Sequence, residues 1–248
     1  NAGVLVTHAD IGEGAKVVGD GITVQALTGA VGADGTVESR ASDFVVWGMA
    51  ASGGKDTGAA GSIGINVVVM DTRAGVGAGA GLQSAGTDGS IAVEARSDVG
   101  LQNLTGGFAY GGKAGVGAAA NVNIVTGFTV ASVGKDGDVD AARAITVHAQ
   151  SLVAPSTEIS MFGADLNVSI IEQILPAQDD TDPYFRSYML MPTSIAAGGG
   201  ISGKEGNAAV GGAVAVNVFV LGTKAYLDEG VQVNTRPELV AGGADRSV

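Results

Sequence analysis

The chain of 248 residues has no cysteine, few aromatic residues and few charged ones. Without cysteine it cannot form a disulfide scaffold, a thiolate zinc site or a thiol nucleophile. Charged residues make up 15% of the sequence, against about 25% in ordinary soluble domains. The 13 basic residues are scattered among 25 acidic ones, so no basic patch for nucleic acid is expected.

Long apolar runs are missing as well. No stretch has the roughly 18 uninterrupted apolar residues of a membrane-spanning helix. The opening NAGVLVTHAD lacks the basic and apolar regions of a signal peptide. Glycine, by contrast, is abundant with 42 residues, and hydrophobic residues make up 46% of the chain. That apolar content excludes disorder caused by a shortage of hydrophobic residues.

A short pattern occurs four times along the chain. It consists of Asn, then Thr six positions later, Ala two positions further and an aliphatic residue after two more. The copies begin at Asn1, Asn66, Asn123 and Asn217, so they are spaced by 65, 57 and 94 residues. Four ungapped matches indicate a repeat architecture. A glycine follows each copy: Gly14, Gly79, Gly137 and Gly230.

The segments between these copies have the composition of strands. Residues 22–26, 91–95 and 145–149 alternate apolar and polar positions and are rich in β-branched residues. Repetition of such segments predicts an all-β parallel β-helix, also called a β-solenoid, with two to three coils of roughly 20 residues per copy. Asp-Gly turns also suit hairpins, so an antiparallel sandwich or barrel stays open as the alternative.

The small residues and the repeated asparagines have a structural interpretation. Inward-facing Ala and Gly would let the coils of a narrow solenoid pack closely. Asn66, Asn123 and Asn217 would stack into a ladder of side-chain amides. The alternative is a simple preference of asparagine for turns or strand starts.

Two segments carry a resemblance to a known family. Residues 112–151 and 211–233 are similar to the passenger regions of filamentous-haemagglutinin-like and leukotoxin-type repetitive adhesins of Gram-negative bacteria. The resemblance implies a right-handed parallel β-helix in a secreted protein at the bacterial cell surface. It implies an adhesin shaft or an extracellular filament subunit. Its partners would be neighbouring repeats, other copies of itself, or a host-cell or matrix glycan or protein, with no nucleic acid and no membrane insertion.

An irregular insertion interrupts the repeats. We expect repeats over 1–150, an inserted loop over 151–197 and a further repeat over 198–248. The insertion offers oxygen ligands for calcium and an aromatic cluster suited to a glycan or protein contact. The plainer interpretation is a loop that covers one edge of the solenoid. The candidate metal ligands are Asp179, Asp180 and Asp182, and the candidate contacts are Tyr184, Phe185, Arg186 and Tyr188.

No catalytic or cofactor-binding residue is predicted, and calcium is the one cofactor considered. A carbohydrate-binding or carbohydrate-active β-helix, such as a polysaccharide lyase or glycoside hydrolase, is the alternative function and would need clustered carboxylates. Asp136, Asp138 and Asp140 alternate as in a calcium loop, but the final Glu is missing, which favours solvated turn acids. His8 and His148 are expected to face outward from strands, without metal-ligand spacing.

Overall fold

The computed structural model describes residues 1–29, 42–85, 89–155, 158–161, 164–167, 194–203 and 208–236. Within these ranges every regular element is a strand and there is no helix. The strands are β1 (Ala2–Ile11), β2 (Lys16–Gly19), β3 (Ile22–Thr28), β4 (Asp43–Gly54), β5 (Thr57–Val76), β6 (Gly81–Ser84), β7 (Ile91–Gly111), β8 (Ala114–Val133), β9 (Asp138–Ala141), β10 (Ile145–Pro155), β11 (Glu158–Met161), β12 (Ala164–Asn167), β13 (Ser194–Ser202), β14 (Ala208–Leu227) and β15 (Gln232–Val233).

Three parallel sheets contain nearly all of these strands. The first sheet has the order β1-β5-β8-β14, and the short second sheet has the order β15-β9-β6-β2. In the third sheet β7 lies between β10 and β13 on one side and β3 and β4 on the other. The one antiparallel pair among the described residues is β11 with β12. The prediction of an all-β protein is confirmed, and the alternative of an antiparallel hairpin sandwich or barrel is wrong.

The chain visits the sheets in a fixed order, and one complete circuit corresponds to one sequence repeat. In the first sheet Asn66 pairs with Asn123, which pairs in turn with Asn217. The pairing offsets of 65 between β1 and β5, 57 between β5 and β8 and 94 between β8 and β14 equal the repeat spacings. The expectation of two to three short coils per copy is therefore wrong, because the long strands of about 20 residues make each circuit one copy long.

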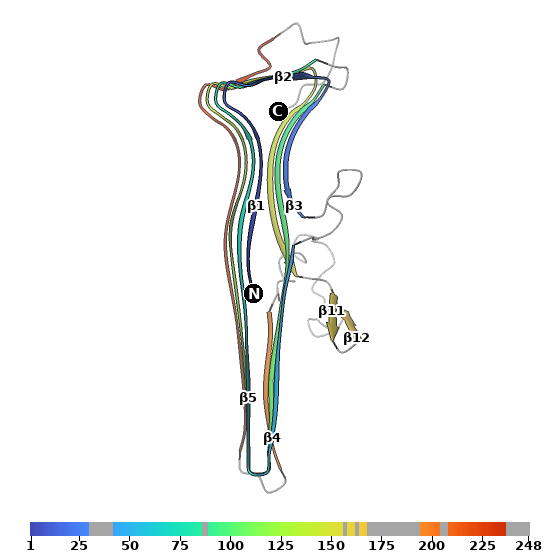
Figure 1. Cartoon of the computed structure of the whole chain (residues 1–248), viewed down its shortest axis with the longest axis vertical. Helices are drawn as coiled ribbons and strands as arrows, with labels where there is room; N and C mark the ends of the chain where they lie inside the picture. Colours follow the sequence, from blue (N-terminus) through green and yellow to red (C-terminus); the bar gives the residue numbers. More distant parts are fainter. Residues whose placement is uncertain are drawn as a thin grey trace, which may run out of the picture.

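The molecule is a long, tapered wedge (Figure 1). Its first and third sheets run side by side along the length and converge at a narrow tip, where Gly54 leads into Thr57 and Gly111 into Ala114. At the other end the two sheets diverge, and the second sheet spans the gap (Figure 1).

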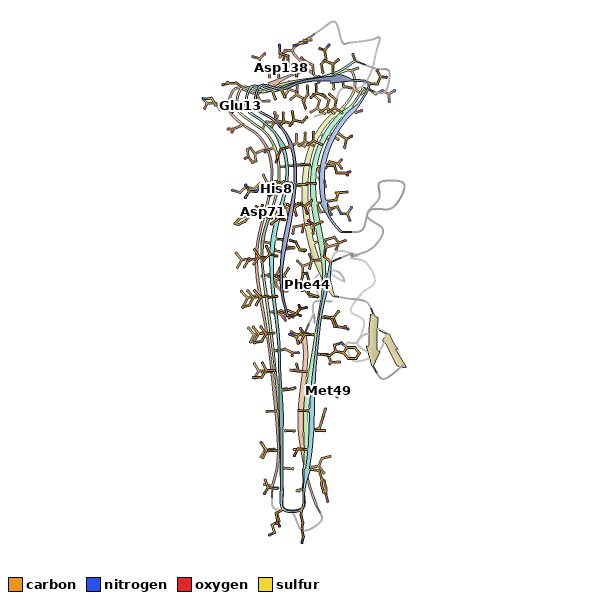
Figure 2. All side chains as sticks on the ribbon, in the orientation of Figure 1. His8, Glu13, Phe44, Met49, Asp71 and Asp138 are labelled. Carbon is orange, nitrogen blue, oxygen red and sulfur yellow. The ribbon has the colours of Figure 1, made fainter. Side chains whose placement is uncertain are left out.

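Residue size inside the wedge follows this taper. The wide end holds a core of large aliphatic residues, including Ile91, Val93 and Val139. A smaller cluster with Met70 and Leu101 lies nearer the middle. Towards the tip the buried residues become Asn and Thr and then Gly and Ala, with few side chains left between the two sheets (Figure 2).

At the tip the two sheets approach until backbone meets backbone. A Cβ on Gly58 would overlap the carbonyl of Tyr110, and one on Gly107 would overlap the carbonyl of Ala118. A Cβ on Gly117 would overlap the carbonyl of Gly107. Ordinary packed sheets lie about 10 Å apart because side chains separate them. The glycine-rich tracts remove those side chains, which is why the wedge can narrow.

One turn position after the first sheet has a positive φ in all four circuits. It is occupied by Gly14, Gly79 and Gly230 and, in the third circuit, by Asp136 with φ 56°. The four positions keep the offsets of 65, 57 and 94 residues. The sequence alignment that placed Gly137 there was off by one residue, because an Asp also tolerates the left-handed conformation.

The strand pairing along β7 is interrupted at about the same level on both of its sides. β3 ends opposite Ser97 and β4 resumes opposite Gly100. On the other side of β7, β10 ends opposite Leu101 and β13 resumes opposite Asn103. The strand pairing therefore extends past the expected repeat boundary at residue 150 to Pro155, and it resumes at Ser194.

Candidate functional site

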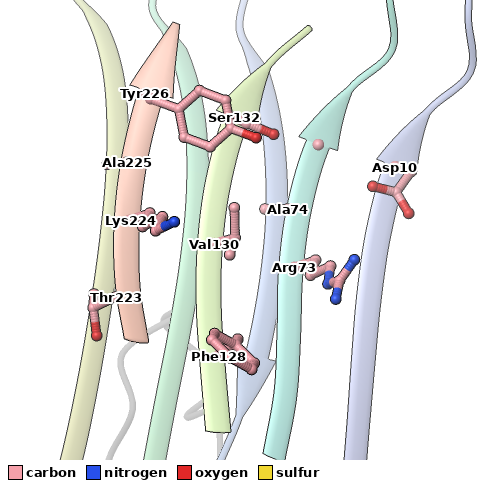
Figure 3. A pocket seen from close by; sticks show the side chains of 11 residues that line it. Asp10, Arg73, Ala74, Phe128, Val130, Ser132, Thr223, Lys224, Ala225 and Tyr226 are labelled. Carbon is pink, nitrogen blue, oxygen red and sulfur yellow. The ribbon is translucent and has the colours of Figure 1, made fainter. Parts of the chain in front are cut away.

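An open hollow of about 1010 Å³ lies on the outer face of the first sheet, towards the wide end (Figure 3). The ends of all four strands of this sheet contribute to it. The sheet bends outward here (Figure 1), which makes the face concave. The lining residues are Asp10, Arg73, Ala74, Gly75, Phe128, Val130, Ser132, Thr223, Lys224, Ala225 and Tyr226.

Two aromatic rings lie in the hollow. Phe128 is 57% exposed and Tyr226 is 45% exposed. Gly222, the partner of Phe128 in β14, makes room for the ring, because a Cβ there would lie 2.7 Å from Cδ1 of Phe128. Tyr226 pairs with Ser132, so a phenol and a hydroxyl stand side by side (Figure 3).

Charged groups flank these rings. Arg73, Val130 and Lys224 occupy one row across three strands. Arg73 Nε donates to Asp71 Oδ1 at 2.7 Å, and His8 Nε2 lies 3.3 Å from Asp71 Oδ2. Partial burial acts to raise the pKa of Asp71, but the hydrogen bonds and charges of Arg73 and His8 outweigh it, so this pKa lies below its ordinary value of 3.8.

The arrangement is suited to binding polar rings. Exposed aromatic faces provide apolar platforms, and the neighbouring hydroxyl, ammonium, guanidinium and carboxylate groups provide hydrogen bonds that fix orientation. The one carboxylate among the lining residues is Asp10. Glycosidic cleavage in most families uses a pair of carboxylates across the scissile bond. The hollow therefore presents a single carboxylate beside exposed aromatic rings and polar groups.

The structure brings the repeated asparagines together inside the wedge. Asn66 and Asn123 are fully buried. Asn123 Nδ2 donates to Asn217 Oδ1 at 2.9 Å and to Ser194 Oγ at 2.9 Å. Asn66 Nδ2 donates instead across the interior, to the carbonyl of Gln102 at 3.2 Å. The amides therefore bond both between circuits and between the two facing sheets.

Of the alternating acids, Asp136 is an exposed turn residue, as the sequence favoured, whereas Asp138 and Asp140 lie in β9 and form ion pairs. The Asp140 side chain is 2% exposed, and its Oδ2 lies 3.2 Å from Arg236 Nε. Arg236 also lies 3.0 Å from Asp138 and donates to Gln83 at 2.9 Å. Asp138 and Asp140 belong to β9, and Gln83 belongs to β6. The guanidinium of Arg236 thus joins two neighbouring circuits of the second sheet. This contact could not be predicted from the sequence, because Arg236 lies 96 residues from Asp140.

The histidines lie on outward positions of long strands. His8 pairs with Arg73 and contacts Asp71, while His148 pairs with Glu94. The described residues contain no group of three His, Cys, Asp or Glu side chains arranged to hold a metal ion.

The remaining predicted site residues lie outside the described residues. They are the acids Asp179, Asp180 and Asp182 and the cluster Tyr184, Phe185, Arg186 and Tyr188. Phe128 and Tyr226 were not singled out from the sequence. The repeat offsets could have found them, because they place Asp71, Phe128 and Gly222 in one outward row and Ser132 beside Tyr226.

Comparisons with family models, with curated proteins and with solved structures found no match to this chain. No described element is a helix long and apolar enough to span a membrane.

Proposed function

We propose that the chain is a structural segment of a right-handed parallel β-solenoid in a secreted, repetitive bacterial surface protein. In this proposal it acts as an adhesin shaft or as an extracellular filament subunit. The right hand follows the strong preference of parallel crossover connections for that hand. No catalytic step is assigned to it.

The main support for the proposal is that each sequence repeat is as long as the offset between paired strands of the first sheet. Each circuit pairs in register with the next in the first sheet, over as many as 20 consecutive residues. Such a stack is quasi-one-dimensional, so it grows by adding circuits and becomes long and stiff. Length and stiffness are what a shaft or filament requires.

The two outermost strands also suit continuation of the stack. Among the described residues β1 pairs with β5 alone and β14 pairs with β8 alone. Leu227 faces the interior side of β14 and is 39% exposed, whereas its partner Val133 is buried. Strand edges with open backbone groups are templates for further pairing. A further circuit, from the same protein or from a second copy, would cover them.

Electron microscopy of the 248-residue chain tests this proposal. We expect fibres with an axial strand repeat near 4.8 Å. Leu221→Lys places a charge on the inward side of β14 and should shorten or abolish the fibres. Val18→Lys, at a 70% exposed position of β2, is the matched control and should leave them intact. Compact, isolated particles of the wild-type chain at every concentration would contradict self-assembly through the ends.

Carbohydrate binding is the second candidate function, and the hollow favours it. The exposed rings of Phe128 and Tyr226 beside Lys224 and Ser132 match the chemistry of a sugar-binding surface. A glycan array with the wild-type chain and Tyr226→Ala tests it. Tyr110→Ala is the matched control, because Tyr110 is 51% exposed near the tip. Retention of every glycan signal by Tyr226→Ala, or loss of the same signals in both variants, would remove this candidate.

A further inference from the structure

The outer face of the first sheet is apolar over most of its length. Residues 57–69, 114–126 and 208–220 of β5, β8 and β14 form adjoining ranges of 13 residues without a single charged side chain. Their outward positions hold Val, Ile, Ala and Gly, apart from Thr57 and Thr126. We call this surface the apolar face.

The apolar face is exposed to solvent in the described part of the chain. Ile63 is 72% exposed, Val214 is 60% exposed and Val116 is 42% exposed. Solvent-facing sheet surfaces usually carry polar residues, whereas the outer positions of these rows are almost all apolar. Contiguous apolar patches of several hundred square ångströms on a soluble protein mark interaction sites.

Its size matches what a stable pair of proteins needs. With a rise of about 3.3 Å per residue and a strand spacing of about 4.8 Å, three strands of 13 residues cover roughly 600 Å². Two copies would together bury roughly 1,200 Å², within the range of specific interfaces. The exposed Val4 of β1, which pairs with Val69, extends the same face.

The surface shape of the apolar face is suited to packing against another β-sheet. Gly61, Ala118 and Gly212 form one row across the three strands, and this row is a shallow groove. Larger side chains rise on either side of it, with Ile63 and Val214 in one adjoining row and Val116 in the other. Facing sheets pack by such interdigitation of apolar rows, with strand directions about 30° apart.

Charged groups lie beyond both ends of the apolar face. Lys113 and Asp56 form a 2.8 Å ion pair at the tip, and Asp71 and Arg73 lie at the opposite end. Figure 2 shows Asp71 and His8 at that upper boundary, with Glu13 and Asp138 further toward the wide end. No charged side chain within the apolar face would therefore be buried by contact across it. A lipid interior fits less well, because the charged tip and the open edges of β1 and β14 would lose hydration.

We propose that the apolar face is the interface between two copies of this chain, packed sheet against sheet as an isologous pair. The contact lies on the side of the solenoid and is separate from pairing through β1 and β14 at its ends. Every added circuit would enlarge it, so lateral pairing would strengthen with solenoid length.

Sedimentation velocity over a concentration series tests the proposal, using the chain with Leu221→Lys so that end-to-end growth is blocked. We expect a monomer–dimer equilibrium. Adding Ile63→Lys should weaken the dimer by about 100-fold or more, because a lysine would be buried without a partner. The circular dichroism spectrum should stay unchanged, since this side chain points outward.

Two control substitutions and one lipid assay complete the design. Val18→Lys in the second sheet and Met49→Lys, 52% exposed on the outer face of the third sheet, should leave the dimer constant unchanged. The inference is overturned by a chain that stays monomeric at its highest soluble concentration, or by dissociation with Met49→Lys and not with Ile63→Lys. Flotation of a monomeric chain with phosphatidylcholine vesicles, lost in Ile63→Lys, would assign the face to lipid and likewise overturn it.

Discussion

At the level of single residues, the buried asparagine amides form hydrogen bonds that connect neighbouring strands and facing sheets. Asn123 receives a hydrogen bond from Asn103 Nδ2 at 3.1 Å and donates to Ser194 and Asn217. It therefore joins two circuits of the first sheet to the facing third sheet. A buried polar group is costly unless its partners are present, so a network of this kind favours one register of stacking over its alternatives.

Replacing Asn123 tests this network. Asn123→Ala leaves the amide and hydroxyl partners without their bonds, and we expect it to lower the free energy of unfolding by about 2–4 kcal/mol. Asn217→Ala, on the exposed strand β14, should cost clearly less. Urea unfolding followed by circular dichroism measures both. Equal costs at the two positions would contradict a role for the network in stability.

Asp71 gives the fold a small dependence on pH. Because its pKa is lowered on folding, its ion pairs stabilise the protein at neutral pH, and this contribution disappears as the pH falls below 3.8. For so exposed a pair the effect should be under about 1 kcal/mol. Asp71→Asn should therefore be less stable than wild type at pH 7, and the difference should shrink as the pH falls from 3.8 through the lowered pKa. A difference that does not shrink with falling pH would show that the loss is not electrostatic.

At the scale of the strand, the glycines differ in role according to the side they face. Gly117 faces inward on β8, where a Cβ would overlap the carbonyls of Gly107 and Gly199. Gly61 faces outward on β5, and the nearest atom to its Cβ would be the carbonyl oxygen of Ala118 at 3.8 Å. The same residue type is therefore obligatory at one position and replaceable at the other.

Two alanine substitutions should separate these roles. Gly117→Ala forces the sheets apart at the tip and should destabilise the protein by about 3 kcal/mol or more, at or beyond the upper end of usual overpacking costs. Gly61→Ala should be neutral or stabilising by up to about 1 kcal/mol, since glycine weakens strand interiors. Thermal melts compare the two variants directly. A tolerated Gly117→Ala would mean that the sheets are not in backbone contact at the tip.

At the scale of the whole molecule, stability should depend on the position of a strand within the stack. β5 and β8 have a partner on each side, whereas β1 and β14 each have one partner among the described residues. In a one-dimensional stack the interfaces between neighbours supply much of the stability. The outer circuits are then the first to open.

Hydrogen exchange can measure this difference in stability between the central and the outer strands. For the isolated chain carrying Leu221→Lys we expect the backbone amides of β8 to exchange at least about 100-fold more slowly than those of β14, because opening free energies differ between central and frayed elements. Mass spectrometry of peptides from 114–133 and 208–227 measures the ratio. Uniform protection along both strands would indicate that the end strand is covered, which would require association through the ends.

The all-β character and the spacing of the repeats could be predicted from the residues alone. Alternation of apolar residues and the absence of helix-compatible runs define strands locally, so these features can be read from neighbouring residues. The spacing of the asparagines also equals the pairing offsets, because identical segments satisfy the same buried positions in successive circuits. The glycines that follow three of the four copies, Gly14, Gly79 and Gly230, occupy the positive-φ turn position, and Asp136 takes that position in the third circuit.

The length of a circuit, the taper, the hollow and the apolar face depend instead on contacts between strands that are distant in the sequence. A period of 57 residues does not say whether the chain turns once or three times within it, because that depends on contacts between distant strands. Asp140 was misjudged because its partner Arg236 is brought near by folding alone. The hollow around Phe128 and the apolar face likewise arise from residues of separate circuits, which become neighbours when the strands pair in register.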